Sequence, residues 1–318
     1  MTRILTLAAA LAITSGGAAA AREVTVEREG LAAPLAGTLA GDTSAGQAGV
    51  VILPGSGPTD RDGNNPMGVK AQPYRLLADA LAEQGIPTLR IDKRGMFASK
   101  AAIPDANKVT IEDYAGDALA WAAKLREETG ADCAWLLGHS EGGLIVLSAA
   151  TRDPAGLCGV ILVAAPGRRP GDLLREQLAA NPGAAPLMEE IERHIATLEA
   201  GQSIEEPIHP GLAPLFGPQI QGYMASFLAQ DPAAMIARIE LPVLILHGRE
   251  DLQVTDADAE TLAAAQPAAE VIMLDGVNHV LKTVPEGDRA ANLASYGDAD
   301  LPLAEGVASA ITAFVAAH

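Results

Sequence analysis

Short apolar strand patterns alternate with helix patterns along most of this 318-residue chain, and that alternation limits the folds it can adopt. Continuous apolar runs such as residues 50–53 are typical of strands that are buried on both faces. Runs such as residues 74–84 place apolar side chains at helical spacing and end at a glycine. Strands that alternate with helices indicate a mostly parallel, doubly wound sheet, so the sequence predicts an α/β fold.

The predicted elements cover the chain from residue 23 to residue 316. The predicted strands are residues 23–28, 35–40, 50–53, 88–91, 134–137, 159–164, 243–247 and 270–274, and the predicted helices are residues 74–84, 114–128, 142–151 and 303–316.

The strand pattern disappears between residues 167 and 236, where helical pieces broken by proline replace it. We interpret residues 167–236 as a helical cap inserted into one catalytic domain, which residues 22–166 and 237–318 form. The cap is moderately apolar, so we expect it to roof an apolar pocket. The apolar cap residues that we expect to line this pocket are Leu212, Leu215, Phe216, Tyr223, Met224, Phe227 and Leu228.

Residues 1–21 have the pattern of a secretory signal peptide: a basic Arg3, an apolar run over residues 4–13 and a small-residue tract that ends at Ala21. The apolar run is too short to span a bilayer, which needs about 20 residues. The segment also lacks the cysteine of a lipoprotein anchor. A buried N-terminal helix is the alternative. We expect cleavage after Ala20 or Ala21 and a periplasmic or secreted protein without a membrane anchor.

Charge and composition exclude several classes of partner. The chain carries 22 Lys and Arg against 40 Asp and Glu, a formal charge of −18, and no basic run. Nucleic acids and anionic lipids are therefore unexpected partners. The sequence contains neither the G-x-G-x-x-G motif nor the G-K-[ST] motif of phosphate-binding loops, so a nucleotide site is not indicated. We expect no metal and no organic cofactor.

The segment Gly138-His139-Ser140-Glu141-Gly142 carries the clearest chemical signal. It joins a predicted buried strand directly to a predicted helix, the context in which G-x-S-x-G forms a nucleophile elbow. A glycine-rich helix start without chemistry is the alternative. The elbow predicts Ser140 as a nucleophile.

A serine hydroxyl needs a base to take its proton and a carboxylate to orient that base. In this context the partners follow in the order serine, acid, histidine, which selects Asp251 and His279. Both follow predicted strands, at the sheet edge where open α/β folds bind ligands. Glu250 is the alternative orienting acid.

The other histidines have weaker claims to a role. His139 is expected to shape the pocket and His194 to face solvent, whereas His209 could face the site or lie on a surface loop.

An oxyanion would need two backbone N–H donors. The expected donors are Glu141, which follows the nucleophile, and Ser56 in the loop after the third predicted strand, with Gly57 as the alternative to Ser56.

Together these motifs resemble the α/β-hydrolase superfamily over nearly the whole mature chain. The loop over residues 54–64 resembles that of a bacterial secreted esterase group with a GSGPTDRDGN loop, and residues 91–95 and 278–282 are similar to the same group. This group is close to serine aminopeptidase-like hydrolases. The resemblance implies a Ser140–Asp251–His279 triad that hydrolyses carboxylic esters. Pro54 departs from the wider superfamily, which often has histidine at that position.

The small cap and the few aromatic residues favour esters with short to medium acyl chains. A peptidase or amidase and an acyltransferase would use the same triad, and a non-catalytic binding protein is a further alternative. Asp60, Arg61 and Asp62 could contact a substrate or brace their loop by charge pairing. The natural substrate and the oligomeric state stay open.

Cys133 and Cys158 directly precede two predicted strands that are parallel neighbours in this superfamily. We therefore expect the two cysteines to lie close together, at the sheet edge opposite the active site. A disulfide and a pair of buried thiols are both compatible with this position.

Overall fold

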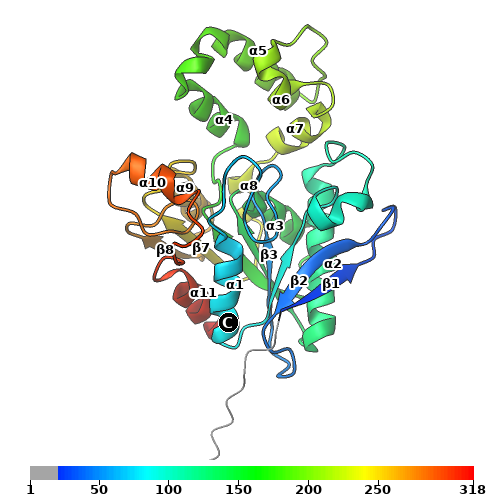
Figure 1. Ribbon diagram of the computed structural model, residues 1–318. Helices are drawn as coiled ribbons and strands as arrows, with labels where there is room; N and C mark the ends of the chain where they lie inside the picture. Colours follow the sequence, from blue (N-terminus) through cyan, green and yellow to red (C-terminus); the bar gives the residue numbers. More distant parts are fainter. Residues whose placement is uncertain (1–20) are drawn as a thin grey trace, which may run out of the picture.

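An eight-stranded sheet forms the centre of the computed structural model, which describes residues 21–318 (Figure 1). The predicted signal peptide, apart from Ala21, lies outside the described residues. The strand order is β1-β2-β4-β3-β5-β6-β7-β8; β2 pairs antiparallel with β1 and β4, and all other pairs are parallel. The strands are β1 (Arg22–Val26), β2 (Leu35–Ala40), β3 (Val50–Leu53), β4 (Thr88–Ile91), β5 (Ala134–His139), β6 (Leu157–Val163), β7 (Val243–Gly248) and β8 (Glu270–Leu274).

The mostly parallel, doubly wound sheet that the sequence predicts is confirmed. From β3 the chain runs outward to β4 and then crosses to β5 on the other side of β3. The loops that follow β3 and β5 therefore diverge at one point of the sheet edge, which is where open α/β folds bind ligands.

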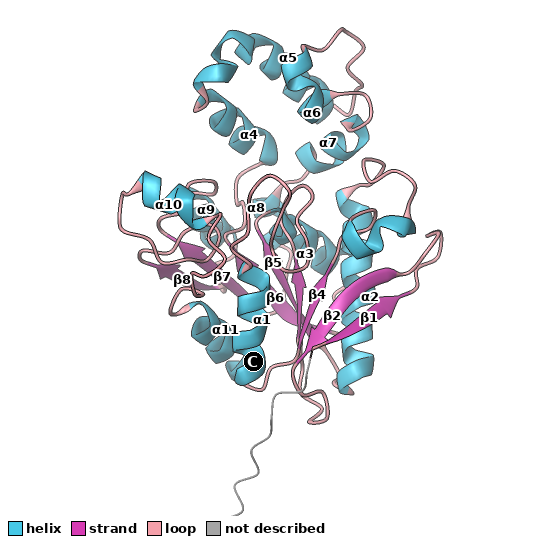
Figure 2. Cartoon of the chain, viewed as in Figure 1, coloured by secondary structure: helices cyan, strands magenta, loops and turns pink. Residues whose placement is uncertain are grey.

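Helices cover both faces of the sheet (Figure 2). Alternate strand residues supply the two cores: Val51 and Leu53 pack on one side, Val50 and Ile52 on the other. The first face carries α2 (Ile111–Thr129), α3 (Glu141–Arg152), α8 (Pro232–Ile236) and α9 (Asp256–Ala265); the second carries α1 (Pro73–Glu83) and α11 (Val307–Ala317).

Two helix starts differ from the prediction by more than one residue. The last helix was expected from residue 303 but begins at Val307, because Gly306 has a left-handed backbone with φ 93°. Helix α2 begins three residues before the predicted start, because Thr110 and Asp113 form a capping box. The short helices η1 (Phe97–Ala102) and α10 (Arg289–Ser295) lie in segments where the sequence predicted no element.

Helices between β6 and β7 gather above the sheet in Figure 1. They enclose a small core of their own, separate from the two cores of the sheet. Helix α8, which the sequence interpretation placed in the cap, instead contacts α3 and α9 and buries Ile236 in the main core. The cap helices are α4 (Pro170–Ala179), η2 (Pro182–Leu187), α5 (Met188–Glu199), η3 (Pro210–Leu212), α6 (Ala213–Phe216) and α7 (Gln221–Leu228).

None of the helices within residues 21–318 combines the length and apolar character that a membrane span requires.

A disulfide joins Cys133 to Cys158, with a Cα–Cα distance of 5.2 Å. Ala134 pairs with Leu157 and Trp135 pairs with Gly159, so Cys158 is the extra residue of a bulge at the start of β6. The two cysteines therefore lie at the amino ends of neighbouring strands, as expected, and of the two alternatives the structure has the disulfide.

We predict that the double variant Cys133→Ala/Cys158→Ala loses about 3 kcal/mol of unfolding free energy, because the bond closes a 25-residue separation in the unfolded chain. Guanidinium denaturation with and without a reductant measures the loss. The reductant should destabilise the wild type and leave the double variant unchanged. Equal stabilities of the oxidised wild type and the double variant would contradict the prediction.

Candidate active site

The turn between β5 and α3 holds Ser140 in an unusual backbone conformation, with φ 54° and ψ −125°. A non-glycine residue in such a region is strained by about 1–3 kcal/mol. Packing fixes the turn, because a β-carbon at Gly138 would lie 2.1 Å from the Gly142 oxygen, and one at Gly142 would lie 2.5 Å from the Leu53 oxygen. The motif glycines thus allow strand, helix start and the loop after β3 to touch backbone to backbone.

Asp251 and His279, 28 residues apart, meet at the carboxyl edge of the sheet. The His279 Nδ1 donates to Asp251 Oδ2 at 2.6 Å, and both residues are buried. The other Asp251 oxygen accepts the backbone N–H groups of Gln253 at 2.7 Å and Val254 at 3.0 Å. Burial alone would raise the pKa of Asp251, but the positive charge and hydrogen bond of His279 and these two N–H groups hold it below its ordinary value. The carboxylate is therefore ionised and fixes the orientation of the imidazole.

Glu250, the alternative orienting acid, has different partners. Its Oε2 accepts the Gly287 N–H at 3.1 Å, and its backbone carbonyl accepts from Asn292 at 2.6 Å. Asp251 is therefore the acid that orients the His279 imidazole.

His139 links three loops of the site. Its Nε2 lies 2.8 Å from the His279 carbonyl oxygen, and its Nδ1 lies 2.9 Å from the Tyr74 hydroxyl, which in turn accepts the Gly55 N–H at 3.1 Å. Burial, reinforced by the charge of His279, lowers the pKa of His139 to about 3. The ring is therefore neutral: Nε2–H donates to His279, and Nδ1 accepts from Tyr74.

This role of His139 differs from the expectation that it shapes the pocket, because the residue does not line the cavity described below. It fixes the backbone of the His279 loop against the elbow, and the two imidazole rings lie with centroids 4.7 Å apart. Tyr74 was not among the predicted site residues, and nothing in its local sequence marks it.

Ser56 and Glu141, the predicted oxyanion donors, both line the cavity, and so does Gly57. A β-carbon at Gly55 would lie 3.1 Å from the Ser140 Cβ, so this loop passes directly beside the elbow. Within residues 21–318, neither the Ser56 amide nor the Glu141 amide donates a hydrogen bond to another group of the chain. Both are free to donate to a ligand.

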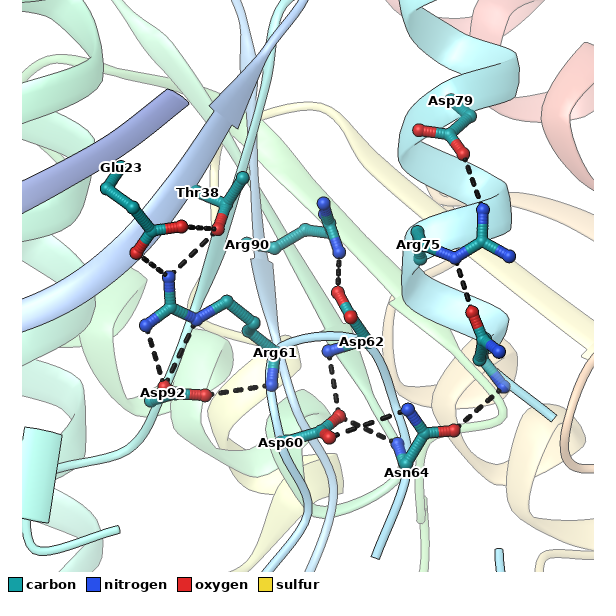
Figure 3. Close-up of polar contacts among 11 residues, drawn as sticks. Glu23, Thr38, Asp60, Arg61, Asp62, Asn64, Arg75, Asp79, Arg90 and Asp92 are labelled. Atoms are coloured by element: carbon teal, nitrogen blue, oxygen red, sulfur yellow. Dashed lines mark hydrogen bonds and ion pairs between the residues drawn. The ribbon is translucent and has the colours of Figure 1, made fainter. Parts of the chain in front are cut away.

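Charge pairs brace the loop that follows Ser56 (Figure 3). Asp60 accepts the backbone N–H groups of Asp62 and Asn64. Arg61 bonds Asp92 through Nη2 at 2.8 Å and also pairs with Glu23, and Asp62 pairs with Arg90. None of Asp60, Arg61 and Asp62 lines the cavity, so the structure favours the brace over substrate contact.

A cavity of about 770 Å³ opens beside the elbow, between the main domain and the cap. Of the predicted roof residues, Leu215, Tyr223, Met224 and Phe227 line it. Leu212, Phe216 and Leu228 are buried in the core of the cap instead. Helix α4 adds Leu173 and Leu174, which the sequence analysis did not single out.

Lys93 and Glu141 are the charged residues that line this cavity, and the remaining lining residues are apolar or uncharged. Lys93 lies in the segment 91–95 that resembles the esterase group, and the sequence predicted no role for this residue. Its signal in the sequence was its place directly after a buried strand, two residues beyond Ile91.

Two cap histidines lie away from the cavity. His209 is exposed, and its Nδ1 accepts the Gly211 N–H, which makes it part of a surface turn. His194 was expected to face solvent, which is wrong: helical spacing places it with Ile191 and Ile195 on the inner face of α5. It is fully buried there, against Phe216.

Within residues 21–318, no group of three or more His, Cys, Asp or Glu side chains is arranged to hold a metal ion.

The family described as "Serine aminopeptidase, S33" matches residues 67–204. Among solved structures, Est1E from Butyrivibrio proteoclasticus aligns with a TM-score of 0.58 over 92% of this chain and 99% of that chain, at 15% identity. Proline iminopeptidase from Mycobacterium smegmatis aligns with a TM-score of 0.58 over 93% of this chain and 98% of that chain, at 16% identity. The chain has the α/β-hydrolase fold.

Esterase EstD from Thermotoga maritima is 29% identical to this chain over 253 residues, which are 73% of this chain and 54% of that protein. The chain thus spans about half the length of this relative. The solved structures, at their low identity, establish the fold of this chain and do not bear on its substrate.

We predict that His139 makes this protein less stable in acid. The folded state keeps His139 neutral down to a pKa of about 3, whereas the unfolded chain binds that proton below about pH 6.5. The contribution of His139 to the free energy of unfolding is therefore fully present above pH 6.5. It falls as the pH drops toward 3, by up to about 1.4 kcal/mol per pH unit. Urea denaturation at pH 6.5, 5.5 and 4.5 should show a flatter pH dependence for His139→Gln than for the wild type.

The exposed His209→Gln serves as the control and should keep the wild-type slope. Parallel curves for wild type and His139→Gln would show that the pKa of His139 is the same in the folded and unfolded states, and would refute the assignment.

Proposed function

We propose that this protein is a serine hydrolase that cleaves carboxylic esters with short to medium acyl chains. The observation that carries the proposal is the buried 2.6 Å hydrogen bond between His279 and Asp251, at the same sheet edge as the strained Ser140 turn. A base that an ionised carboxylate orients, at the same sheet edge as a nucleophile elbow, is the arrangement that activates a serine hydroxyl.

In the proposed mechanism, His279 takes the proton of Ser140 as Oγ attacks the ester carbonyl carbon. The tetrahedral oxyanion accepts hydrogen bonds from the Ser56 and Glu141 N–H groups, and the start of α3 adds favourable electrostatics. Collapse breaks the ester bond, and His279 protonates the departing alcohol. Water that His279 activates then attacks the acyl-enzyme and releases the acid.

The charges of the cavity favour esters over aminoacyl amides. An aminopeptidase must pair the free ammonium group of its substrate, for which a carboxylate suits best. Glu141 is the carboxylate of the cavity lining, and Lys93 and the Tyr223 hydroxyl already bind it. The positive charge of Lys93 would therefore repel the ammonium group of an aminopeptidase substrate. A serine aminopeptidase is the alternative function, which the family match over residues 67–204 favours.

The apolar lining suits an acyl chain. Met67 and Phe97 line the cavity and are 77% and 42% exposed, so they form an apolar rim that an ester substrate can approach. The Esterase EstD relative also supports an ester as the substrate class.

The proposal extends to the organisation of the chain. We assign residues 22–166 and 237–318, together with α8, to the catalytic domain, the segment from residue 167 to the end of α7 to a cap, and residues 1–21 to a signal peptide for export to the periplasm or the medium. The Cys133–Cys158 disulfide supports export, because such bonds persist in oxidising compartments.

The triad assignment predicts that Ser140→Ala and His279→Ala each lower kcat for p-nitrophenyl butyrate by at least about 10³-fold, because the residues act as a unit. Asp251→Asn should cost less than either. Glu250→Gln is the matched control, since it neutralises the neighbouring carboxylate and should keep wild-type turnover. Near-wild-type activity of Ser140→Ala would end the serine-hydrolase proposal.

The substrate assignment predicts a higher kcat/KM for butyrate than for palmitate esters of p-nitrophenol, because a small cap with few aromatic side chains roofs the apolar cavity. Aminoacyl p-nitroanilides should be poor substrates. The same purified protein is assayed on all three substrates. Preference for palmitate would instead indicate a lipase, and preference for the anilides would establish the peptidase alternative.

A further inference from the structure

Lys93 is a buried lysine at the back of the cavity, just beyond the carboxyl end of β4. Its side chain is 2% exposed. A buried ammonium group is costly unless its donors are satisfied. The Lys93 Nζ donates to the Gly55 carbonyl oxygen at 2.7 Å and lies 3.3 Å from Glu141 Oε1.

These two partners belong to the two segments that carry the proposed oxyanion donors. The Gly55 carbonyl and the Ser56 N–H are the two ends of one planar peptide unit, and in a trans peptide they point in opposite directions. Holding the carbonyl toward Lys93 therefore aims the Ser56 N–H away from Lys93. A cation on the carbonyl oxygen also polarises the peptide, which strengthens its N–H as a donor.

The second partner of Lys93 is the side chain of Glu141, whose backbone N–H is the other proposed oxyanion donor. Its backbone N–H is the first of α3, while its side chain is 2% exposed and held from both sides. Lys93 binds Oε1, and the Tyr223 hydroxyl of cap helix α7 donates to Oε2. Burial raises the pKa of Tyr223 well above its ordinary value, so the hydroxyl keeps its proton as a donor.

Stability alone is a weak reason for this ion pair. Replacing a buried pair with apolar residues is often neutral or stabilising. The pair does, however, join the loop after β3, the start of α3 and the cap through consecutive contacts among Gly55, Lys93, Glu141 and Tyr223.

We propose that Lys93 is a positioning residue of the oxyanion hole: it orients and polarises the Gly55–Ser56 peptide and holds Glu141 beside it. The proposal rests on the proposed serine-hydrolase function. Tyr223 extends the same contacts to the cap, so a cap helix is tied to the geometry of the hole.

The kinetic test is Lys93→Met, which removes the charge and keeps a long side chain. The kcat for p-nitrophenyl butyrate should fall at least about tenfold, since the loss of a whole oxyanion donor costs about 10²–10³-fold. The KM should change less than about threefold, because the interaction lost is one that strengthens in the transition state. Arg94→Met is the matched control: it removes a buried cation from the next position, but its partners Asp113 and Asp117 lie on α2.

A double variant separates positioning from stability. Lys93→Met leaves Glu141 as a buried carboxylate without its cation partner, and Lys93→Met/Glu141→Gln removes that negative charge. The melting temperature of the double variant should recover toward the wild-type value while its kcat stays low. Recovery of kcat together with the melting temperature would reduce Lys93 to a structural role and overturn the proposal.

A substrate-free measurement keeps the proposal testable even if ester hydrolysis fails. In ¹H–¹⁵N spectra of the uncomplexed protein, the Ser56 amide resonance should shift in Lys93→Met and in the double variant, and stay in place in Arg94→Met. An unchanged Ser56 resonance overturns the proposal whatever the activity. A wild type without ester turnover, or a Ser140→Ala variant with full turnover, instead refutes the proposed function.

Discussion

Backbone contact at the end of β5 is the constraint on which the rest of the site depends. Gly138, Gly142 and the Leu53 carbonyl approach so closely that no side chain fits between them. This contact holds Ser140 in its strained turn at the start of α3. It also brings the loop after β3 beside the elbow, which places the free amides of Ser56 and Glu141 on the same cavity.

Buried polar groups then fix the loops around this contact, and each has a definite charge. Asp251 is ionised because His279 and two backbone amides stabilise the carboxylate, whereas His139 is neutral because burial disfavours its charged form. Hydrogen bonds through Tyr74 and His139 thus connect the Gly55 loop to the His279 loop. Lys93 connects the same Gly55 loop to Glu141 at the start of α3. The charge pairs of Arg61 and Arg90 lie outside the cavity and brace the loop from behind (Figure 3).

The parts of this arrangement that the sequence predicts are those with short-range signals. The order of strands and helices follows from local apolar patterns, and the elbow follows from glycines within five residues of one another. The loops of Asp251 and His279 are predictable because each directly follows a recognisable strand.

The parts that the sequence does not predict depend on partners far along the chain. Tyr74 is 65 residues from His139, and Lys93 is 48 residues from Glu141, so neither contact has a local pattern. The cap residues that line the cavity are the least predictable part of the site, because apolar side chains fill the core of the cap as well as line the cavity. The pattern cannot separate Phe216, which is buried in that core, from Leu215, which lines the cavity.

The most direct test of the central claim is covalent labelling of the nucleophile. The wild-type protein is incubated with a fluorophosphonate, digested, and analysed by peptide mass spectrometry. We expect one phosphonyl adduct, on the peptide that contains Ser140, together with loss of esterase activity in proportion to labelling. An enzyme that loses its activity while Ser140 stays unmodified, or that carries the adduct on another serine, would contradict this expectation.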